Sequence, residues 1–335
     1  MKTPGKLNWG ILGTGAIAAK FSSGLVGSET GTLVAIGSRT HESAAKFASN
    51  FPGSTAHGSY EALLADENVQ AVYISTPHPM HAEWAIKAAR AGKHILCEKP
   101  LAMNHAEAKS IVDAAKRAGV FLMEGFMYRC HPQTRKIVEL VRDKVVGEIL
   151  LVRANFSFRA DYDLKSRLLC GALGGGGILD VGCYCVSMAR LIAGEEPAAL
   201  FGAGRIGAES CVDEFAIASL KFPGGMLAQI AAGVQLTLEN DVWLFGTEGQ
   251  IEITNPWFGN GKVIVRKNGV SDPEEIEVHS DRSVYALEAD EVAANLVRRE
   301  SPAMSWADSL GNMKTLDLWR EAVGMVYNFE TRERF

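Results

Sequence analysis

The chain has 335 residues, of which 47% are hydrophobic and 22% are charged, and its formal net charge is -5. This composition is typical of a folded globular protein and excludes a collagen-like or low-complexity chain. The 34 Lys and Arg residues are balanced by 39 Asp and Glu residues, so we expect no broad cationic surface and no nucleic-acid partner. At roughly 150 residues per domain, the length predicts about two domains.

The apolar runs are short, and the first begins at Leu7 with no charged region and long apolar stretch before it. None reaches the roughly 20 residues that a membrane helix needs, so we expect a cytoplasmic protein with no membrane partner. The cysteines are scattered without a CxxC motif, which predicts reduced, mostly buried thiols and no metal. A zinc site built from Cys130, Cys183 and Cys185 is the alternative, without the usual ligand spacing.

Short apolar runs alternate with helical patterns over residues 1–125. This alternation is typical of βαβ units and predicts an α/β domain with a doubly wound parallel sheet. The expected strands are Leu7–Leu12, Thr32–Ser38, Ala71–Ser75, His94–Cys97 and Phe121–Glu124. The expected helices are Ala16–Leu25, Glu42–Phe51, Ser59–Leu64, His81–Ala91 and His105–Ala118. Gly31, Gly92 and Gly119 are each expected to end a helix in the left-handed conformation.

Longer strand-like segments replace this alternation after Gly147. The turn Phe222–Gly225 predicts a hairpin, so residues 126–335 are expected to form an α+β domain on a large open, mostly antiparallel sheet. The expected strands are Ile149–Phe158, Ala198–Gly207, Val212–Phe222, Met226–Gly233, Asn240–Gly246, Gln250–Thr254 and Lys262–Lys267. The expected helices are Gly177–Ala193, Tyr285–Glu300 and Trp306–Tyr327. Packing of the C-terminal helix back on the first domain is left open.

The first predicted strand is followed by Gly13-Thr14-Gly15-Ala16-Ile17-Ala18, which opens a helix. This is the G-x-G-x-x-G/A pattern in the strand–turn–helix context that dinucleotide binding requires. Gly13 permits the tight turn, Gly15 lets a pyrophosphate approach the backbone, and the helix N-terminus faces the phosphates. We therefore predict a dinucleotide site, with an ordinary strand–helix turn as the alternative.

The second predicted strand ends in Ser38-Arg39, where an NAD-binding protein usually carries Asp or Glu. A hydroxyl and a guanidinium suit a 2′-phosphate through charge-assisted hydrogen bonds. The pair therefore predicts NADP rather than NAD as the cofactor. The alternative is that the two residues only begin a solvated loop.

Two further motifs follow strands whose carboxyl ends lie on the ligand-binding edge of such a sheet. The first is Thr76-Pro77-His78-Pro79-Met80-His81, in which Pro77 shapes a wall beside the nicotinamide ribose. Its histidines are expected to pack or to contact the cofactor, with metal ligation as the alternative. The second is Glu98-Lys99-Pro100, whose lysine reaches the nicotinamide ribose and a substrate oxygen unless it is only solvated.

Four glycines, Gly174–Gly177, precede a helix that carries Asp180 and Tyr184. A spacing of four puts the carboxylate and the phenol on one helix face. A phenol whose pKa is lowered by a cation such as Lys99 exchanges a proton with an alcohol or a carbonyl. The glycines let the backbone approach a ligand. The alternatives are a flexible loop and a core tyrosine.

Together these motifs resemble the glucose-fructose oxidoreductase and inositol dehydrogenase (Gfo/Idh/MocA) family over essentially the full length. The segments Glu124–Pro132 and Phe245–Gly249 are similar to its dihydrodiol dehydrogenase and NADP-dependent D-xylose dehydrogenase branch. The resemblance implies an N-terminal Rossmann domain and hydride transfer between NADP and a carbohydrate or diol. It also implies a homodimer or homotetramer that packs through the C-terminal sheet. Tyr184 separates the chain from the many inositol dehydrogenase-like members with His at this position, and Gly125 and Cys130 depart from the family's common residues.

By this resemblance, Tyr184 is the acid/base, Lys99 stabilises the tyrosinate and the oxyanion, and Asp180 orients the substrate. Arg129 and His131 are expected to hold the substrate or the cofactor, with an ion pair or a helix cap as the alternative. The residues expected to contact the cofactor are Gly13, Thr14, Gly15, Ala16, Ile17, Ser38, Arg39, Thr76, Pro77, His78, His81, Glu98 and Lys99. The alternative functions are a sugar–sugar oxidoreductase or keto-sugar reductase with tightly bound cofactor, and a non-catalytic NADP-sensing regulator.

Overall fold

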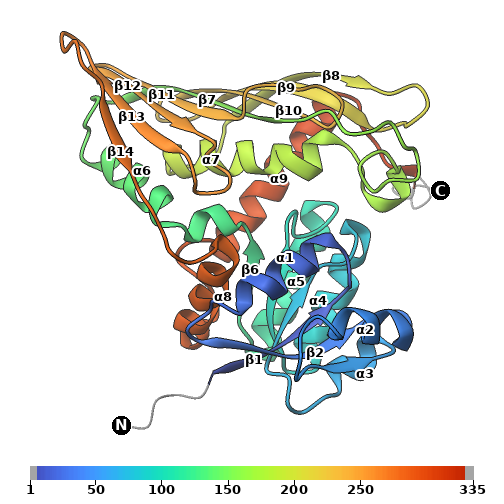
Figure 1. Cartoon of the computed structure of the whole chain (residues 1–335). Coiled ribbons are helices and arrows are strands. Elements are labelled where there is room, and N and C mark those ends of the chain that lie inside the picture. Colours follow the sequence, from blue (N-terminus) through green and yellow to red (C-terminus); the bar gives the residue numbers. More distant parts are fainter. Residues whose placement is uncertain (1–5, 329–335) are drawn as a thin grey trace. The chain divides into compact units, whose positions relative to one another are not determined.

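The computed structural model describes residues 6–328, and the chain divides into two compact units. The first unit runs up to Cys130 and includes Ser280–Ser309, and the second consists of His131–His279 with the chain from Leu310 onward. The first unit is built on a six-stranded sheet and the second on an eight-stranded sheet (Figure 1).

The sheet of the first unit is parallel, with the strand order β3-β2-β1-β4-β5-β6. The order reverses between β1 and β4, which confirms the predicted doubly wound α/β fold. The strands are β1 (Leu7–Leu12), β2 (Gly31–Gly37), β3 (Thr55–His57), β4 (Ala71–Ile74), β5 (His94–Glu98) and β6 (Leu122–Gly125). The α-helices are α1 (Ala16–Leu25), α2 (His41–Ala48), α3 (Tyr60–Leu64), α4 (His81–Arg90), α5 (His105–Ala118) and α8 (Val284–Asn295).

The glycines that were expected to end helices differ in their conformation. Gly92 and Gly119 have φ angles of 71° and 68°, so both are left-handed as predicted. The prediction for Gly31 is wrong, because it is the first residue of β2 and does not have a positive φ. A Cβ at Gly31 would lie 2.6 Å from Cδ1 of Leu25, so close packing, rather than backbone conformation, requires glycine there.

Aromatic packing fixes α1 against the sheet of the first unit. The ring of Phe21 stacks on Tyr73 with the centroids 3.8 Å apart, and it meets Trp9 edge-on at 5.4 Å. All three side chains are fully buried. Because α1 is anchored to β1 and β4 in this way, the glycine turn between β1 and α1 has a defined position.

The sheet of the second unit has the strand order β14-β13-β12-β11-β7-β10-β9-β8. Only the β7–β10 pair is parallel among these pairings, which confirms the mostly antiparallel sheet. The hairpin at Phe222–Gly225 joins β9 to β10, with Gly225 at a φ of 96°. The strands are β7 (Ile149–Ser157), β8 (Ala199–Ile206), β9 (Asp213–Lys221), β10 (Leu227–Gly233), β11 (Asp241–Gly246), β12 (Gly249–Thr254), β13 (Lys262–Lys267) and β14 (Glu274–Glu277).

Helices cover one face of this sheet. A π turn, Ile178–Gly182, leads directly into α7 (Cys183–Ala193), which packs on β7 and β10. Figure 1 shows α7 running along that face. Side chains on β9 alternate accordingly: Ala216, Ala218 and Leu220 are buried, whereas Ile217 and Ser219 are exposed on the opposite face. The other α-helices are α6 (Pro132–Arg142) and α9 (Trp306–Ala322).

One helical stretch, Gly171–Ala193, has the length and apolar composition of a membrane-spanning helix. The most apolar 18 consecutive residues of this stretch are 83% buried inside the protein. Its second half is α7, which lies against the sheet of the second unit, and a buried core helix passes the same test of length and composition. The expectation that every apolar run is too short for such a helix missed this segment.

Candidate active site

Three of the predicted motifs lie at one edge of the parallel sheet in the first unit. Strands β1, β4 and β5 are neighbours, so their carboxyl ends lie side by side. These ends are followed by the Gly13–Gly15 turn, by Thr76-Pro77 and by Lys99. The reversal of strand order between β1 and β4 makes this edge the expected ligand site of a doubly wound sheet.

The turn between β1 and α1 has room for a phosphate group. Gly13 has a φ of 112°, and a Cβ there would lie 2.9 Å from Oγ of Ser75, so only glycine fits. A Cβ at Gly15 would meet nothing within 4 Å, which leaves the backbone open to a ligand. No side chain caps the start of α1, and its first turn has no acidic residue. The open N-terminus and its dipole therefore fit a pyrophosphate.

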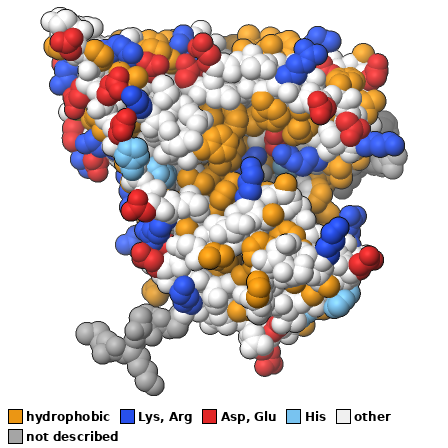
Figure 2. Space-filling view, viewed as in Figure 1, with side chains coloured by type: hydrophobic (Ala, Val, Ile, Leu, Met, Phe, Trp, Pro, Cys, Tyr) orange, Lys and Arg blue, Asp and Glu red, His pale blue; other side chains and the backbone are white. Residues whose placement is uncertain are grey.

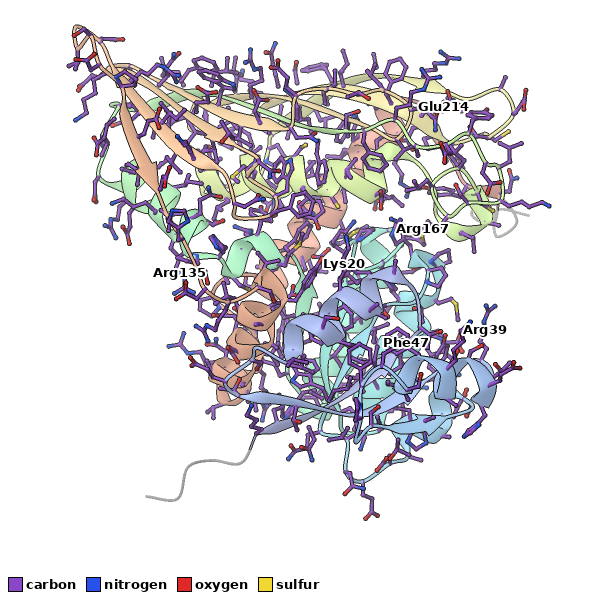
Figure 3. The ribbon with its side chains drawn as sticks, viewed as in Figure 1. Lys20, Arg39, Phe47, Arg135, Arg167 and Glu214 are labelled. Atoms are coloured by element: carbon purple, nitrogen blue, oxygen red, sulfur yellow. The ribbon has the colours of Figure 1, made fainter. Side chains whose placement is uncertain are left out.

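Ser38 and Arg39 border this turn from the end of β2. Ser38 is buried, and its Oγ lies 3.4 Å from Oγ1 of Thr14 in the glycine turn. Arg39 is exposed and extends outward at the start of α2 (Figure 3). Thr40, rather than Arg39, caps that helix. A hydroxyl and a cation thus stand at the position where a carboxylate would repel a 2′-phosphate.

His81 ties two of the ligand-edge loops together. Its side chain is fully buried, and its ring nitrogens lie 2.9 Å from the carbonyl oxygens of Pro100 and Thr76. Burial lowers the pKa of His81, and the charge of Lys99 lowers it further, against the effect of the two carbonyls. The ring of His78 meets it edge-on at 5.7 Å. In residues 6–328, no group of three or more His, Cys, Asp and Glu side chains is arranged to hold a metal.

Lys99 follows β5 directly and is half-buried. The residue before it, Glu98, is buried and accepts a hydrogen bond from the phenol of Tyr73. Burial and the negative charge of Glu98 raise the pKa of Tyr73. The phenol therefore stays neutral and continues to donate, which fixes the end of β5 from which Lys99 extends.

A buried carboxyl near this strand end was missed by the sequence analysis. Glu288 of α8 is fully buried, and neither carboxyl oxygen has a hydrogen-bond partner among the described residues. Burial and the charge of Glu98 raise the pKa of Glu288 well above that of an ordinary carboxyl. A Cβ at Gly125 would lie 3.5 Å from Oε1 of Glu288. No sequence signal distinguishes this residue, because most helical acids face solvent.

Arg129 and His131 both have structural partners. Arg129 is buried, and its Nη2 lies 3.4 Å from Oδ1 of Asp308. His131 caps the start of α6, where its Nδ1 accepts a hydrogen bond from the N–H of Gln133 at 3.1 Å. These contacts are the ion pair and the helix cap that the sequence left open as alternatives. A role of either residue toward a ligand stays a prediction.

In the second unit, Asp180 lies in the π turn before α7 and is buried. Its Oδ1 lies 2.7 Å from Nη1 of Arg167, whose side chain is 56% exposed. Figure 3 shows Arg167 on the loop beside the end of the sheet that holds Glu214. A partly exposed cation thus lies on a buried carboxylate, and both are polar groups of the kind that binds hydroxyls.

Tyr184 is in the first turn of α7 and is 4% exposed. Its ring meets Phe156 and Trp257 edge-on, at 5.3 Å and 5.7 Å, and the latter two stack on each other at 5.5 Å. This cluster restricts rotation of the phenol. The segment was expected to be α-helical from Gly177. Its first turn is instead a π turn, a feature that is frequent at functional sites.

The glycine run before this helix is packed against protein. A Cβ at Gly175 would lie 2.7 Å from the carbonyl oxygen of Leu168, and a Cβ at Gly177 would lie 2.8 Å from Cα of Gly233. At Gly176 the nearest atom is a carboxylate oxygen of Asp213. Close approach within the second unit therefore explains glycine at these positions.

Basic and acidic side chains are interspersed on the surface of both units in the view of Figure 2. In this view neither unit shows a broad area of a single charge sign.

Family models match the sequence of both units. The model described as "Oxidoreductase family, NAD-binding Rossmann fold" matches residues 7–126, and the model of the "GFO/IDH/MocA C-terminal domain" matches residues 134–252. Both matches agree with the resemblance found in the motifs.

Curated relatives and solved structures match nearly the whole chain. The chain is 33% identical to trans-1,2-dihydrobenzene-1,2-diol dehydrogenase of Xenopus tropicalis, over 95% of this chain and 98% of that one. It is 33% identical to D-xylose 1-dehydrogenase (NADP(+)) 2 of Haloferax volcanii, over 92% and 95%. The crystal structure of a 3-ketoreductase from Actinomadura kijaniata with NADP and TDP-benzene has a TM-score of 0.87 and 27% identity, covering 95% of this chain and 98% of that chain.

Proposed function

The chain belongs to the GFO/IDH/MocA family of oxidoreductases, and on this premise we propose that it is a cytoplasmic, NADP-dependent dehydrogenase of sugars, polyols or dihydrodiols. It transfers hydride between the nicotinamide and a hydroxyl-bearing carbon. The observation that carries the proposal is the convergence of the Gly13–Gly15 turn, Thr76-Pro77 and Lys99 on one edge of the parallel sheet. Relatives named for a diol and for D-xylose support this range of substrates.

Ser38 and Arg39 are the basis for choosing NADP. The buried hydroxyl and the exposed guanidinium together suit a 2′-phosphate, and neither position offers the carboxylate that would bind the ribose hydroxyl of NAD. A relative named for NADP and a similar structure that contains NADP support the same choice. When bound, the nicotinamide supplies the hydride exchange with the substrate.

The proton is handled by residues of this chain. Tyr184 exchanges the proton of the reacting hydroxyl, and its aromatic neighbours hold the phenol in one orientation. Lys99 stabilises negative charge on the phenolic and substrate oxygens, and Asp180 accepts a hydrogen bond from a neighbouring substrate hydroxyl. Arg167 balances the charge of Asp180 at 2.7 Å. A positioned acid/base of this kind contributes about 100-fold to 10,000-fold to a reaction rate.

A substrate panel tests this proposal. Aldoses, polyols, dihydrodiols and keto-sugars are each incubated with the protein and with NADP or NAD, and reduced nicotinamide is followed by its absorbance. We expect stoichiometric NADPH from at least one sugar or diol and slower reduction of NAD. Preference for NAD would contradict the role given to Ser38 and Arg39. Tight NADP binding without turnover of any panel member would favour a regulatory protein instead.

Keto-sugar reduction is a second candidate function, favoured by the similarity to a 3-ketoreductase over nearly the full chain. The same residues serve it in reverse, with Tyr184 donating a proton to the carbonyl. Consumption of NADPH by a keto-sugar, without measurable oxidation of the matching alcohol at neutral pH, would identify this direction. Copurification of the protein with tightly bound cofactor would point to exchange between two sugars.

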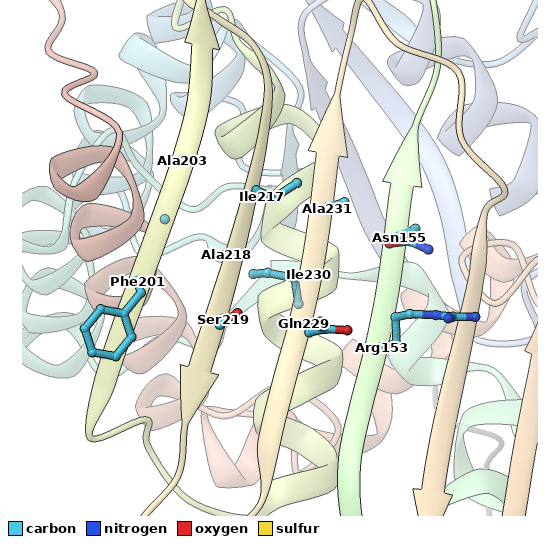
Figure 4. Close-up of a pocket in the computed structure, with 11 residues that line it drawn as sticks. Arg153, Asn155, Phe201, Ala203, Ile217, Ala218, Ser219, Gln229, Ile230 and Ala231 are labelled. Carbon is cyan, nitrogen blue, oxygen red and sulfur yellow. The ribbon is translucent and has the colours of Figure 1, made fainter.

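We also propose that copies of the chain associate through the outer face of the second unit's sheet. Phe201 is 70% exposed and Ile217 is 56% exposed, and they lie on the adjacent strands β8 and β9. Both residues line a pocket that extends over β10 to Arg153 on β7 (Figure 4). Large exposed apolar side chains that gather on one face of a sheet are typical of an interface.

The solution mass tests this association. Wild type is expected to be a dimer or tetramer by light scattering, and the variant Phe201→Glu with Ile217→Lys is expected to have a lower mass. An unchanged mass in the variant would contradict the assignment of this face.

A further inference from the structure

Asp213 connects two parts of the second unit that are far apart in the sequence. It is the first residue of β9 and is fully buried, and its Oδ2 accepts a hydrogen bond from the N–H of Ile178 at 2.6 Å. Ile178 opens the π turn that carries Asp180, and α7 with Tyr184 follows directly. One buried carboxyl therefore holds the start of the segment that bears both substrate-side residues.

Gly176 makes room for this carboxyl. Its φ is 114°, and a Cβ at this position would lie 2.2 Å from Oδ1 of Asp213. Oδ1 is buried and has no hydrogen-bond partner among the described residues. The position of the carboxyl therefore requires glycine at position 176, because a larger residue would displace the carboxyl from Ile178.

The charge of Asp213 is costly in this position. Burial raises the pKa of Asp213 to about 7, against the opposing effects of the N–H groups of Ile178 and Gly177 and of the Arg320 guanidinium. A buried carboxylate contributes little to stability because it loses its hydration. We therefore relate Asp213 to the position of the segment that begins at Ile178. Near neutral pH, both of its charge states are populated.

The other ionisable groups on the elements around Asp213 have partners of their own. Strand β10, whose backbone at Ala232 and Gly233 lies against Gly177, carries no ionisable side chain. The partnered groups are Asp180 with Arg167 at 2.7 Å, Glu214 with Arg205 at 3.5 Å and with Ser210 at 3.3 Å, Arg320 with Asp317 at 3.0 Å, and the Tyr327 phenol with the carbonyl of Gly175 at 2.6 Å.

We propose that Asp213 is a positioning residue for substrate binding: its ionised form anchors the start of the 178–193 segment, and its protonation loosens that anchor and weakens affinity for the substrate. The identity of the substrate rests on the proposed function, whereas the anchor does not. An ionised acceptor makes an N–H···O bond about twice as strong as a neutral acceptor does. We therefore expect an effect of about fivefold on the anchored segment when the proton binds.

Hydrogen exchange measures the anchor without any substrate. Amide protection of the 176–184 segment, corrected for the intrinsic effect of pH, is compared at about pH 6 and pH 8 in wild type, Asp213→Asn and Glu214→Gln. Opening of this segment alone leaves the Asp213 carboxyl buried in β9 without the N–H of Ile178, so its ionised form favours the closed segment. Protection in wild type is therefore expected to fall about fivefold at the lower pH, opposite to the trend for global unfolding. Asp213→Asn is expected to show the low value at both pH values. Glu214→Gln, which neutralises the next buried carboxyl on the same strand, is expected to keep the wild-type step.

Steady-state kinetics measures the consequence for substrate. In wild type, KM for the sugar or diol is expected to rise about fivefold as pH falls through 7, with kcat changing less. Asp213→Asn is expected to lose this step while its affinity for NADP, which binds the other unit, stays unchanged.

Equal protection in wild type at both pH values would overturn the anchor, and this measurement does not depend on a variant that folds. A pH step in protection without a step in KM would overturn the role in substrate affinity. If no sugar or diol is turned over, the proposed function fails by itself, and hydrogen exchange still decides whether Asp213 is the anchor.

Discussion

Replacing Asp213 by Asn is expected to change how stability depends on pH. Burial raises the pKa of this carboxyl from 3.8 to about 7, so the folded chain binds the proton more tightly than the unfolded chain does. The stabilisation that comes from this proton is complete below the unfolded-state pKa, and it is lost as pH rises through the folded-state pKa of about 7. The Asn side chain does not titrate, so Asp213→Asn lacks this contribution to the pH dependence of stability.

The size of the effect follows from the difference between the two pKa values. From 3.8 to about 7 is about 3 units, or about 4 kcal/mol at 1.36 kcal/mol per unit. The change ends near pH 7, so a titration from about pH 5 to pH 8.5 covers about 2 of these 3 units, which corresponds to about 3 kcal/mol. The free energy of unfolding of wild type is therefore expected to fall by about this amount relative to that of the variant over this window.

Urea titrations followed by tryptophan fluorescence provide the assay, with wild type, Asp213→Asn and Glu214→Gln measured at the same pH values. Histidines with lowered pKa values, such as His81 and His131, are present in all three proteins and cancel in the differences. A difference between wild type and Asp213→Asn that stays constant across the window would refute the reasoning. A difference between wild type and Glu214→Gln that changes by the same amount over this window would show that the effect is not specific to Asp213.

Three other substitutions test separate parts of the site. Arg39→Ser is expected to raise KM for NADP about tenfold and to leave KM for NAD nearly unchanged, because only the 2′-phosphate loses a charged donor; equal effects on both cofactors would contradict the cofactor assignment. Gly176→Ala is expected to cost at least about 2 kcal/mol of stability in a urea titration, because its Cβ would meet the Asp213 carboxyl at 2.2 Å, whereas Gly225→Ala, with a φ of 96° and nothing within 4 Å, is expected to cost less. Glu288→Gln is expected to keep the urea midpoint of wild type near neutral pH, because burial and the charge of Glu98 favour the neutral acid that Gln mimics; a large loss of stability would show that the charged form is the native one.

Much of the fold was predictable because hydrophobic periodicity and turn residues determine it locally. The runs Leu7–Leu12 and Ala16–Leu25 were located to the residue. The missed strands are those with little periodicity: β3 has three residues, and β14 is an edge strand with the sequence EEIE. Helix α6 was also missed, although Pro132 at its first turn and His131 at its cap are the signals that mark a helix start.

The candidate site was predictable only where a motif carries the chemistry. Gly13, Gly15 and Lys99 belong to such motifs, and the parallel sheet brings them to one edge. Asp213 and Glu288 have no local signal, because their importance comes from burial that only the tertiary fold creates. For the glycine run, the sequence predicted an approach to a ligand, whereas the structure shows close contacts with protein atoms.

The central claim is that Tyr184 is the acid/base of an NADP-dependent oxidoreductase. The most direct test is the turnover of Tyr184→Phe with the best substrate of the panel, together with its NADP affinity and unfolding midpoint. We predict a loss in kcat of about 100-fold or more, with unchanged NADP affinity and an intact fold. Turnover near the wild-type value would contradict the claim.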